Sequence, residues 1–352
     1  MIDSPHNPSK EVWIQQTNES LRIPQKKRNE RVIDLFAGCG GLALGFEAVG
    51  LQTCGFESNT ECVETYQFNL AGQCIGEHLT PDTRYPDAEI IIGGPPCQPF
   101  SVGGKQKGLA DSRDGFPVFI AAVEQLNPDI FLLENVRGLL YRNKWYFEQI
   151  QNRLEKLGYI VEAKLLNAKY YGVPQNRERV IVVGHRGGFQ FPTPQTQIIS
   201  AGTALGSMFE EIPDNVKWLT PSMDAYIAKY EKASCCRNPR DLHYDKPART
   251  LTCRNLAGAT GDMHRIRLPD GGRRRITLRE AARLQSFPDW FQFAGRETSQ
   301  YYQVGNAVSP LFAKALAQSV IDYLDRGTEY TSEAVIQGNK TKEQKRKILE
   351  AV

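Results

Sequence analysis

Short apolar runs alternate with amphipathic stretches along the first half of the chain. Val32–Phe36 is apolar enough for a strand buried on both faces, and Leu42–Val49 after it has the spacing of a helix. Further strands are predicted at Gln52–Phe56, Ala88–Ile92, Asp129–Leu133, Tyr159–Leu166 and Arg179–Val183, and further helices from Asn59 through Phe68, at Val118–Leu126 and at Tyr146–Leu157. This alternation predicts an α/β fold with a doubly wound, mostly parallel sheet covered by helices on both faces.

The composition fits one large domain and a smaller one, because 352 residues with 41% hydrophobic content can bury a sizeable core. No apolar run is long enough to span a membrane, and no basic segment followed by an apolar one opens the chain, so no secretory signal is expected. The eight cysteines are scattered without a CxxC pair, which argues against a zinc site and a disulfide framework. We therefore expect a soluble protein of the reducing cytoplasm.

Positive charge is concentrated in one segment, although the net charge is only +3. Between Arg237 and Arg283 there are eleven arginines and five acids. The planar guanidinium pairs bidentately with phosphate or with the edge of guanine, so this segment is typical of a nucleic-acid surface. A solvated charged face is the alternative.

Cys97 directly follows the apolar run Ala88–Ile92 and four backbone-restricting residues, Gly93-Gly94-Pro95-Pro96. Open α/β sheets place their chemistry past the carboxyl ends of strands, and such a turn fixes the direction of one thiol. Cys97 is therefore interpreted as a positioned nucleophile. An inert core thiol or a tight turn that happens to hold a cysteine is the alternative.

The first strand-turn-helix unit predicts a nucleoside site. Gly38 and Gly40 let the backbone approach a ligand, and Glu57, at the end of the second strand, can accept both ribose hydroxyls. Phe36 is suited to stacking on a nucleoside. A dinucleotide oxidoreductase is the competing interpretation, but the turn lacks the third glycine of GxGxxG.

Six ordered motifs between about Arg31 and Leu316 resemble those of the DNA cytosine-5 methyltransferases of bacterial restriction-modification systems. In chain order they are Asp34–Gly41 with Glu57, Pro95–Gln98, Glu134–Val136, Gln175–Arg179, Arg279–Pro288 and Gln303–Val308. The resemblance implies a Rossmann-like catalytic and cofactor-binding domain at 31–187 plus 300–326, and a target-recognition domain with its supporting helix at 188–299. The polar residues 1–30 are expected to be an extension outside the core, and 327–352 a charged tail.

The resemblance also implies a role for single residues. Cys97 would add to carbon 6 of cytosine, Glu134 would hydrogen-bond to or protonate ring nitrogen 3, and Arg177 would hold the base, with Arg179 left structural. A helix cap is the alternative role for Glu134. S-adenosyl-L-methionine would be bound by Phe36, Gly38, Gly40, Glu57, Asp82, Pro95, Asn306 and Val308. Asp82 is preferred over Glu77 and Asp87 as the acid that contacts adenine.

The target base lies inside a duplex, so it must be flipped into the pocket. DNA contacts are expected from Ser101, Lys105 and Lys107 in the glycine-containing loop after Cys97, and from Arg240, Arg254 and Asn255 in the recognition segment. Asp114 interrupts the usual Arg-Gly pair at the far end of that loop. Thr277-Leu278-Arg279-Glu280 predicts a capping box that opens a helix.

Other functions are weighed against this one. Transfer-RNA methylation uses the same cysteine and glutamate, but the long segment between Arg186 and Arg275 favours duplex DNA. A catalytically silent homologue should lack Cys97, Glu134 or Arg177, and none is missing. Exocyclic-amine methylation requires Asn or Asp before Pro-Pro. Gly94 holds that position here, so this chemistry is disfavoured. We expect a monomer that acts on double-stranded DNA, without a membrane or a metal, linked functionally to a restriction endonuclease without stable contact.

Overall fold

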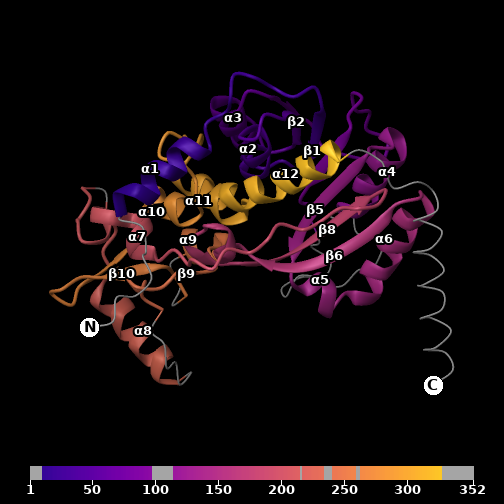
Figure 1. Ribbon diagram of the computed structural model, residues 1–352. Helices are drawn as coiled ribbons and strands as arrows, with labels where there is room; N and C mark the ends of the chain where they lie inside the picture. The colour runs from indigo at the N-terminus through magenta and orange to yellow at the C-terminus, as the bar shows by residue number, and fades with distance from the viewer. Residues whose placement is uncertain (1–9, 97–113, 215, 234–239, 259–261, 327–352) are drawn as a thin grey trace.

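A seven-stranded sheet forms the centre of the computed structural model, which describes residues 10–96, 114–214, 216–233, 240–258 and 262–326. Its strand order is β3-β2-β1-β4-β5-β8-β6 (Figure 1). The strands are β1 Arg31–Leu35, β2 Gln52–Glu57, β3 Gln73–Gly76, β4 Ile90–Gly93, β5 Ile130–Val136, β6 Ile160–Asn167 and β8 Glu178–His185. The first five run parallel, and β8 is antiparallel to both of its neighbours. The prediction of a mostly parallel sheet is confirmed.

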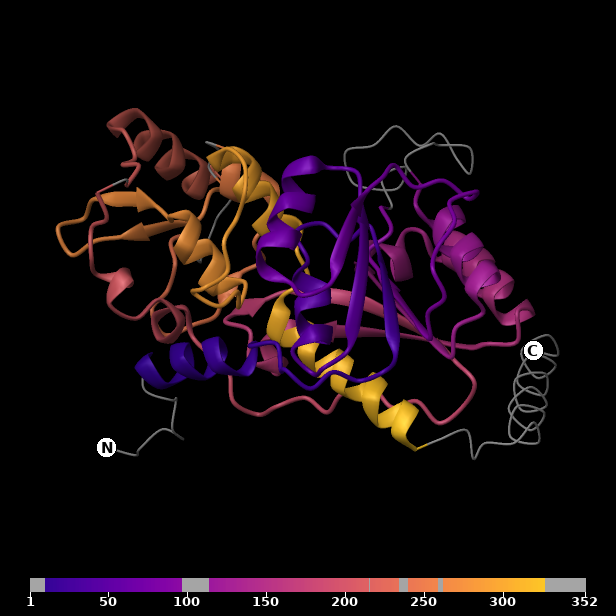
Figure 2. The ribbon, with the colours of Figure 1, turned by 90° about the horizontal axis from the view of Figure 1, so that it is seen from above.

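Alternation along the strands divides the core into two layers. Ile33 and Phe131 point to one face, whereas Val32 and Ile130 point to the other. The first face is covered by α4 Phe116–Leu126 and α6 Lys144–Lys156, and the second by α2 Gly41–Glu47 and α12 Pro310–Asp325. Figure 2 shows α12 crossing the sheet on the side away from α4 and α6. Because β1, β2, β4 and β5 run parallel, their carboxyl ends share one edge of the sheet.

The sequence prediction missed β3 because its pattern is weak. Only Cys74 of its four residues is buried, and the strand lies at the edge of the sheet. The other predicted strands are present within one to three residues of their expected ends. Asn59 caps α3 Thr60–Asn69 as predicted, and its side chain accepts a hydrogen bond from the backbone N–H of Cys62.

Outside the sheet, short elements are joined by buried ion pairs. The guanidinium of Arg265 is fully buried and pairs with Asp241 and with Glu231, the latter at 2.8 Å. Arg274, also fully buried, pairs with Glu280 at 2.7 Å. The elements are α7 Ala201–Leu205, η4 Gly206–Phe209, α8 Pro221–Ala233, β9 Ala248–Arg249, α9 Cys253–Ala257, β10 Arg265–Arg267, β11 Arg273–Arg275 and α10 Leu278–Leu284. Part of the arginine-rich segment is thus internal, not a nucleic-acid surface.

The expectation that residues 1–30 lie outside the core is wrong for the part that the structure describes. Helix α1, Lys10–Ser20, packs against α7, and Trp13 and Leu21 are buried. The indole N–H of Trp13 donates to the carbonyl oxygen of Gly172 at 3.3 Å, and that of Trp290 donates to the carbonyl oxygen of Asn18 at 3.1 Å. The polar composition of this segment concealed its two buried apolar side chains.

Among the described residues, every helix is too short or too polar to cross a bilayer. The predicted tail at 327–352 lies outside the described residues.

Candidate functional site

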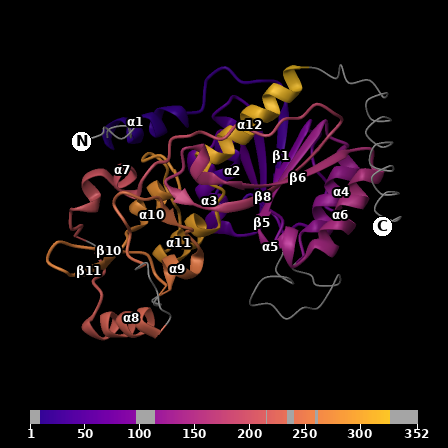
Figure 3. The ribbon, with the colours of Figure 1, turned by 60° about the horizontal axis from the view of Figure 1, so that its bottom comes forward.

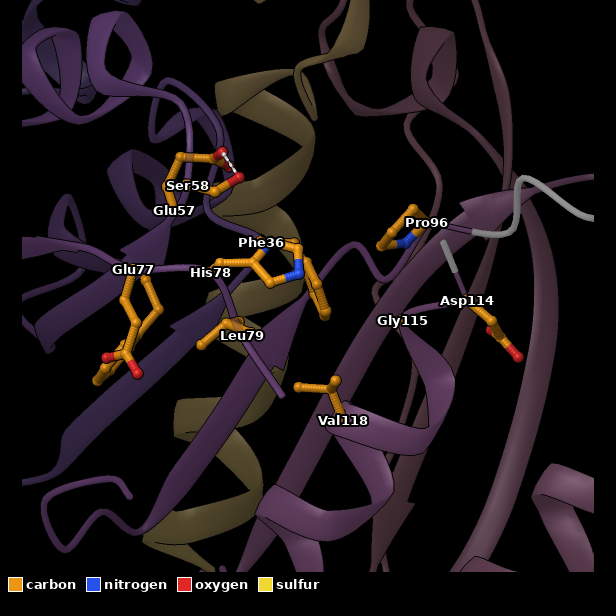
Figure 4. A pocket seen from close by; sticks show the side chains of 11 residues that line it. Phe36, Glu57, Ser58, Glu77, His78, Leu79, Pro96, Asp114, Gly115 and Val118 are labelled. Atoms are coloured by element: carbon orange, nitrogen blue, oxygen red, sulfur yellow. Dashed lines mark hydrogen bonds between the residues drawn. The ribbon is translucent and has the colours of Figure 1, made fainter. Parts of the chain in front are cut away.

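A pocket opens at the carboxyl edge of the sheet, between the ends of β1, β2, β3 and β4 (Figure 4). Its volume is about 210 Å³. Apolar walls come from Phe36, Phe56, Leu79, Pro96 and Val118, and polar groups from Glu57, Ser58, Glu77, His78, Asp114 and Gly115. Such a mixture of apolar walls and a few convergent polar groups is typical of a small-molecule site.

The turn after β1 is held in a strained conformation at this pocket. Phe36 has a φ of 58°, which is uncommon for a residue with a side chain, and Gly38 and Gly40 have φ values of 55° and 84°. A Cβ atom at Gly40 would lie 2.3 Å from Cδ1 of Leu70. Glycine is therefore required at Gly40 by both conformation and space.

Glu57 connects the first turn to the second strand. Its Oε2 accepts a hydrogen bond from the backbone N–H of Gly38 at 2.9 Å, and its Oε1 accepts one from the backbone N–H of Asn59 at 2.8 Å. One carboxylate thus fixes the end of β2 and the glycine turn against each other. It also lines the pocket, where its remaining lone pairs can accept hydroxyl groups of a ligand.

The structure corrects the choice of Asp82 as the acid that contacts the ligand. Asp82 is exposed and does not line the pocket, whereas Glu77 and His78 do, directly after β3. Because sequence reasoning missed β3, it could not show that Glu77 follows a strand at the same edge. A strand prediction at Gln73–Gly76 would have identified it.

A buried acid lies near the pocket on β1. Asp34 is 1% exposed, and neither of its carboxylate oxygens has a hydrogen-bond partner among the described residues. Burial, and then the nearby charge of Glu57, raise the pKa of Asp34 well above its usual range.

Pro95 and Pro96 are fixed by two hydrogen bonds. The side-chain amide of Asn135 donates to the carbonyl oxygen of Pro95 at 3.0 Å. The backbone N–H of Gly115 donates to the carbonyl oxygen of Pro96, also at 3.0 Å. Cys97 itself lies outside the described residues. Of the two residues before it, Pro95 is anchored to β5 and Pro96 to the residue before α4.

Glu134 lies beside this turn and pairs with an arginine. A Cβ atom at Gly94 would lie 3.9 Å from its Oε2, and the Nε of Arg179 lies 2.7 Å from its Oε1. Glu134 is 9% exposed. The two side chains come from the paired strands β5 and β8 and form a largely desolvated acid–guanidinium pair.

The structure corrects the assignment of the two arginines. Arg177 is buried, and its guanidinium donates to the carbonyl oxygens of Leu251 at 2.8 Å, Ala307 at 2.9 Å and Gly305 at 3.4 Å. Burial, and then the charge of Arg179, lower the pKa of Arg177 to about 9. Arg177 thus joins three chain segments, and Arg179 is the arginine beside Glu134.

Two glutamines extend this buried junction. The side-chain amide of Gln175 donates to Oε1 of Gln285 at 2.7 Å, and that of Gln285 donates to the carbonyl oxygen of Val304 at 2.8 Å. Oε1 of Gln175 accepts from the backbone N–H of Leu251 at 2.9 Å. Gln175 thus connects its own motif to Gln285, 110 residues later in the chain. Gln285 in turn connects its motif to the one that contains Val304.

Asn306 and Val308 do not line the pocket. Oδ1 of Asn306 accepts a hydrogen bond from the thiol of Cys253 at 2.7 Å. The carbonyl oxygen of Val308 would lie 2.4 Å from a Cβ atom at Gly41, so Val308 packs behind the glycine turn. Pro95 does not line the pocket either, and its carbonyl oxygen accepts the side-chain amide of Asn135.

The predicted DNA-contacting residues have different environments. Asn255 is 4% exposed and forms a capping box with Thr252, so its assignment as a base reader is wrong. Arg240 pairs with Asp262, and Arg254 is exposed. Ser101, Lys105 and Lys107 lie outside the described residues. The predicted capping box at Thr277 and Glu280 is present and opens α10.

A family model described as C-5 cytosine-specific DNA methylase matches residues 30–322. The chain is 54% identical over 313 residues to the Type II methyltransferase M.AplI of Arthrospira platensis, which covers 86% of this chain and 89% of the relative. It is 34% identical over 331 residues to the Type II methyltransferase M.NgoFVII of Neisseria gonorrhoeae. That match covers 83% of this chain and 86% of the relative.

Solved structures show the same fold. A DNA modification methyltransferase encoded within an E. coli prophage superposes with a TM-score of 0.63 at 23% identity, covering 84% of this chain and all of that one. The Spodoptera frugiperda DNMT2 mutant superposes with a TM-score of 0.63 at 20% identity, covering 83% of this chain and all of the other.

Proposed function

Because the chain belongs to the C-5 cytosine-specific DNA methylases and is a Type II DNA cytosine-5 methyltransferase, we propose that it transfers the methyl group of S-adenosyl-L-methionine to a flipped cytosine through Cys97. The Glu134–Arg179 pair is the observation that supports this best, because it lies beside the turn that leads to Cys97. We also propose that the methylation protects DNA from a partner restriction endonuclease.

The pocket residues fit the cofactor. Glu57 can accept the ribose hydroxyls, Glu77 can accept the adenine amino group, and Phe36, Leu79 and Val118 provide apolar walls for the ring. The unpartnered carboxyl of Asp34 near the same turn suits a cationic ligand. S-adenosylmethionine supplies the methyl group when it is bound.

Carbon 5 of cytosine is a poor nucleophile, so the ring must be activated first. The Cys97 thiolate forms a bond to carbon 6, and the electron pair of the 5,6 double bond becomes available at carbon 5. Glu134 donates a proton to ring nitrogen 3, which stabilises the adduct. After carbon 5 is methylated, the proton on carbon 5 leaves to a base, the sulfur–carbon bond breaks, and the proton on ring nitrogen 3 returns to Glu134, which restores the aromatic ring, the thiolate and the acid.

Arg179 is proposed to hold Glu134 and the carbonyl oxygen of the base. Its guanidinium is planar, so one edge can contact the carboxylate while another N–H donates to the base. This role replaces the one that the sequence analysis gave to Arg177. Desolvation of the pair strengthens both contacts.

Base-resolution detection of 5-methylcytosine in DNA from cells that express the chain tests the function. The proposal expects one methylated sequence context and no methylation in cells without the gene. Methyl uptake by transfer RNA but not by DNA would instead support the transfer-RNA alternative.

Glu57→Ala is expected to weaken S-adenosylmethionine binding by about 1.5–3 kcal/mol, because charge-assisted hydrogen bonds to the ribose are lost. Titration calorimetry measures the effect. Glu64→Ala, a change of an exposed acid on α3, serves as the matched control and should bind normally. Equal affinity in both variants would place the cofactor elsewhere.

Arg179→Lys is expected to lower kcat by roughly 100-fold with little change in the KM for DNA. Lysine keeps the charge but loses the fork that contacts the acid and the base together. Steady-state methylation assays measure both constants. Arg153→Lys, on the exposed side of α6, is the control, and an Arg179→Lys enzyme as active as this control would contradict the assignment.

A further inference from the structure

The corner that joins β5 to α6, residues 136–145, exposes large side chains beside the catalytic edge. Val136, Tyr141 and Trp145 are 49%, 58% and 47% exposed. The corner is itself well anchored, because Leu139 in α5, Gly138–Tyr141, is completely buried. Several large apolar side chains exposed in one short, ordered segment indicate an interaction surface.

The same 136–145 corner is basic. It contains Arg137, Arg142 and Lys144 and no acid. The guanidinium of Arg137 lies 4.9 Å above the ring of Tyr141 and pairs with Glu178 at 3.0 Å. Arg142 is exposed, and no ion pair of its guanidinium is found within the described ranges. Cations interleaved with aromatic rings are typical of a surface that binds nucleic acid.

The 136–145 corner is also fixed to the active site. Val136 follows Glu134 by two residues, and Tyr146, next to Trp145, donates its hydroxyl to the carboxylate of Asp114. Asp114 precedes Gly115, whose backbone N–H holds Pro96. These contacts connect the 136–145 corner to the turn before Cys97.

Figures 1 and 3 show α5 on the same side of the molecule as α8 and α9, which belong to the recognition segment. Arg254 of α9 is exposed, and the Glu134 end of β5 leads directly into α5. A straight duplex placed against α9 with one base at Glu134 would extend toward the 136–145 corner.

We infer that the 136–145 corner binds the sugar-phosphate backbone of the DNA arm beyond the target cytosine, on the side away from the recognition segment. Arg137 and Arg142 contact phosphates, and Tyr141 and Trp145 cover the adjoining sugars. This inference rests on the proposed function, since it requires duplex DNA as substrate. It assigns the corner a positioning role that is independent of sequence.

The test measures fluorescence anisotropy of a labelled 30-base-pair duplex that carries the sequence methylated by the wild-type protein. The double variant Arg137→Ala/Arg142→Ala is expected to raise Kd by about tenfold at 0.1 M KCl and to reduce the slope of log Kd against log salt by about two. Tyr141→Ala/Trp145→Ala should raise Kd by about three- to tenfold with an unchanged slope. Arg153→Ala and Phe68→Ala, exposed side chains elsewhere, should bind as the wild type does.

Shortening the duplex on one side of the target gives a second readout. The wild type should lose affinity when the arm away from the recognition segment is shortened, and the double variant should not. Cofactor affinity, measured by calorimetry, should be the same in all these proteins, which shows that they fold.

An unchanged Kd and salt slope in the double variant would overturn the inference. So would a wild-type dimer that Tyr141→Ala/Trp145→Ala converts to a monomer, because the corner would then be an interface between two copies. A wild-type protein that neither binds nor methylates duplex DNA would overturn the proposed function as well, so the two failures are distinguishable.

Discussion

Cys97→Ser is expected to abolish methyl transfer, with a loss in kcat of at least about a thousandfold. The hydroxyl of serine is a far weaker acid than a thiol, so too little of the nucleophilic anion forms to add to carbon 6. The change removes little volume, and Pro96 before it is held by the backbone N–H of Gly115. Cofactor and DNA affinities should therefore remain nearly intact, as measured by calorimetry and anisotropy.

A duplex with 5-fluorocytosine at the target adds a covalent readout. Fluorine at carbon 5 cannot leave as a proton does, so the wild-type protein should form a denaturation-resistant adduct that peptide mapping locates at Cys97. The Cys97→Ser protein should form none. Substantial turnover by the variant, or methylation without a trapped adduct on the fluorinated duplex, would contradict the covalent mechanism.

Arg177→Met should destabilise the fold by about 3 kcal/mol. Methionine fills much of the volume but leaves the carbonyl oxygens of Leu251, Gly305 and Ala307 without their donor in a buried junction. The loss is measured as the free energy of unfolding in urea. The variant also removes a guanidinium group whose burial lowers its pKa to about 9, and this offsets a part of the cost.

Arg254→Met is the matched control for that experiment, because Arg254 is exposed and its replacement should change the free energy of unfolding by less than about 0.5 kcal/mol. If Arg177→Met were as stable as this control but catalytically dead, the original assignment of Arg177 to the base would be restored.

The sequence predicted the fold well where the hydrophobic period was strong. Ile90–Ile92 and Ile130–Leu133 are apolar at every position, and Val32–Leu35 at every position but Asp34, because both faces of the parallel strands are covered. The edge strand β3 has a single buried residue and no such period. Because β3 was not predicted, the position of Glu77 directly after it was missed as well.

The site was predictable where chemistry alone selects a residue, and less so where geometry does. Glu57 is the last residue of β2 and Glu134 lies near the carboxyl end of β5, so both are at the predicted edge. Arg177 and Arg179 are two residues apart on one segment, and only tertiary contacts separate a carbonyl-binding arginine from the partner of Glu134. Asn255 has side-chain chemistry suited to adenine, but its amide is used within its own capping box.

The N-terminal segment that contains α1 contacts both α12 and the segment around Asp289. On one side Asp289 is held through its backbone N–H by Asn18 at 2.6 Å, and on the other the ammonium of Lys314 donates to the carbonyl oxygen of Ser20 at 2.5 Å. Farther along, Arg28 pairs with Asp325 at the end of α12 at 2.6 Å. These contacts add to the buried junction of Arg177, Gln175 and Gln285, which already joins segments far apart in the sequence. We therefore expect a protein shortened to begin at Arg31 to hold α12 and the segment around Asp289 together less firmly, because it lacks Asn18, Ser20 and Arg28.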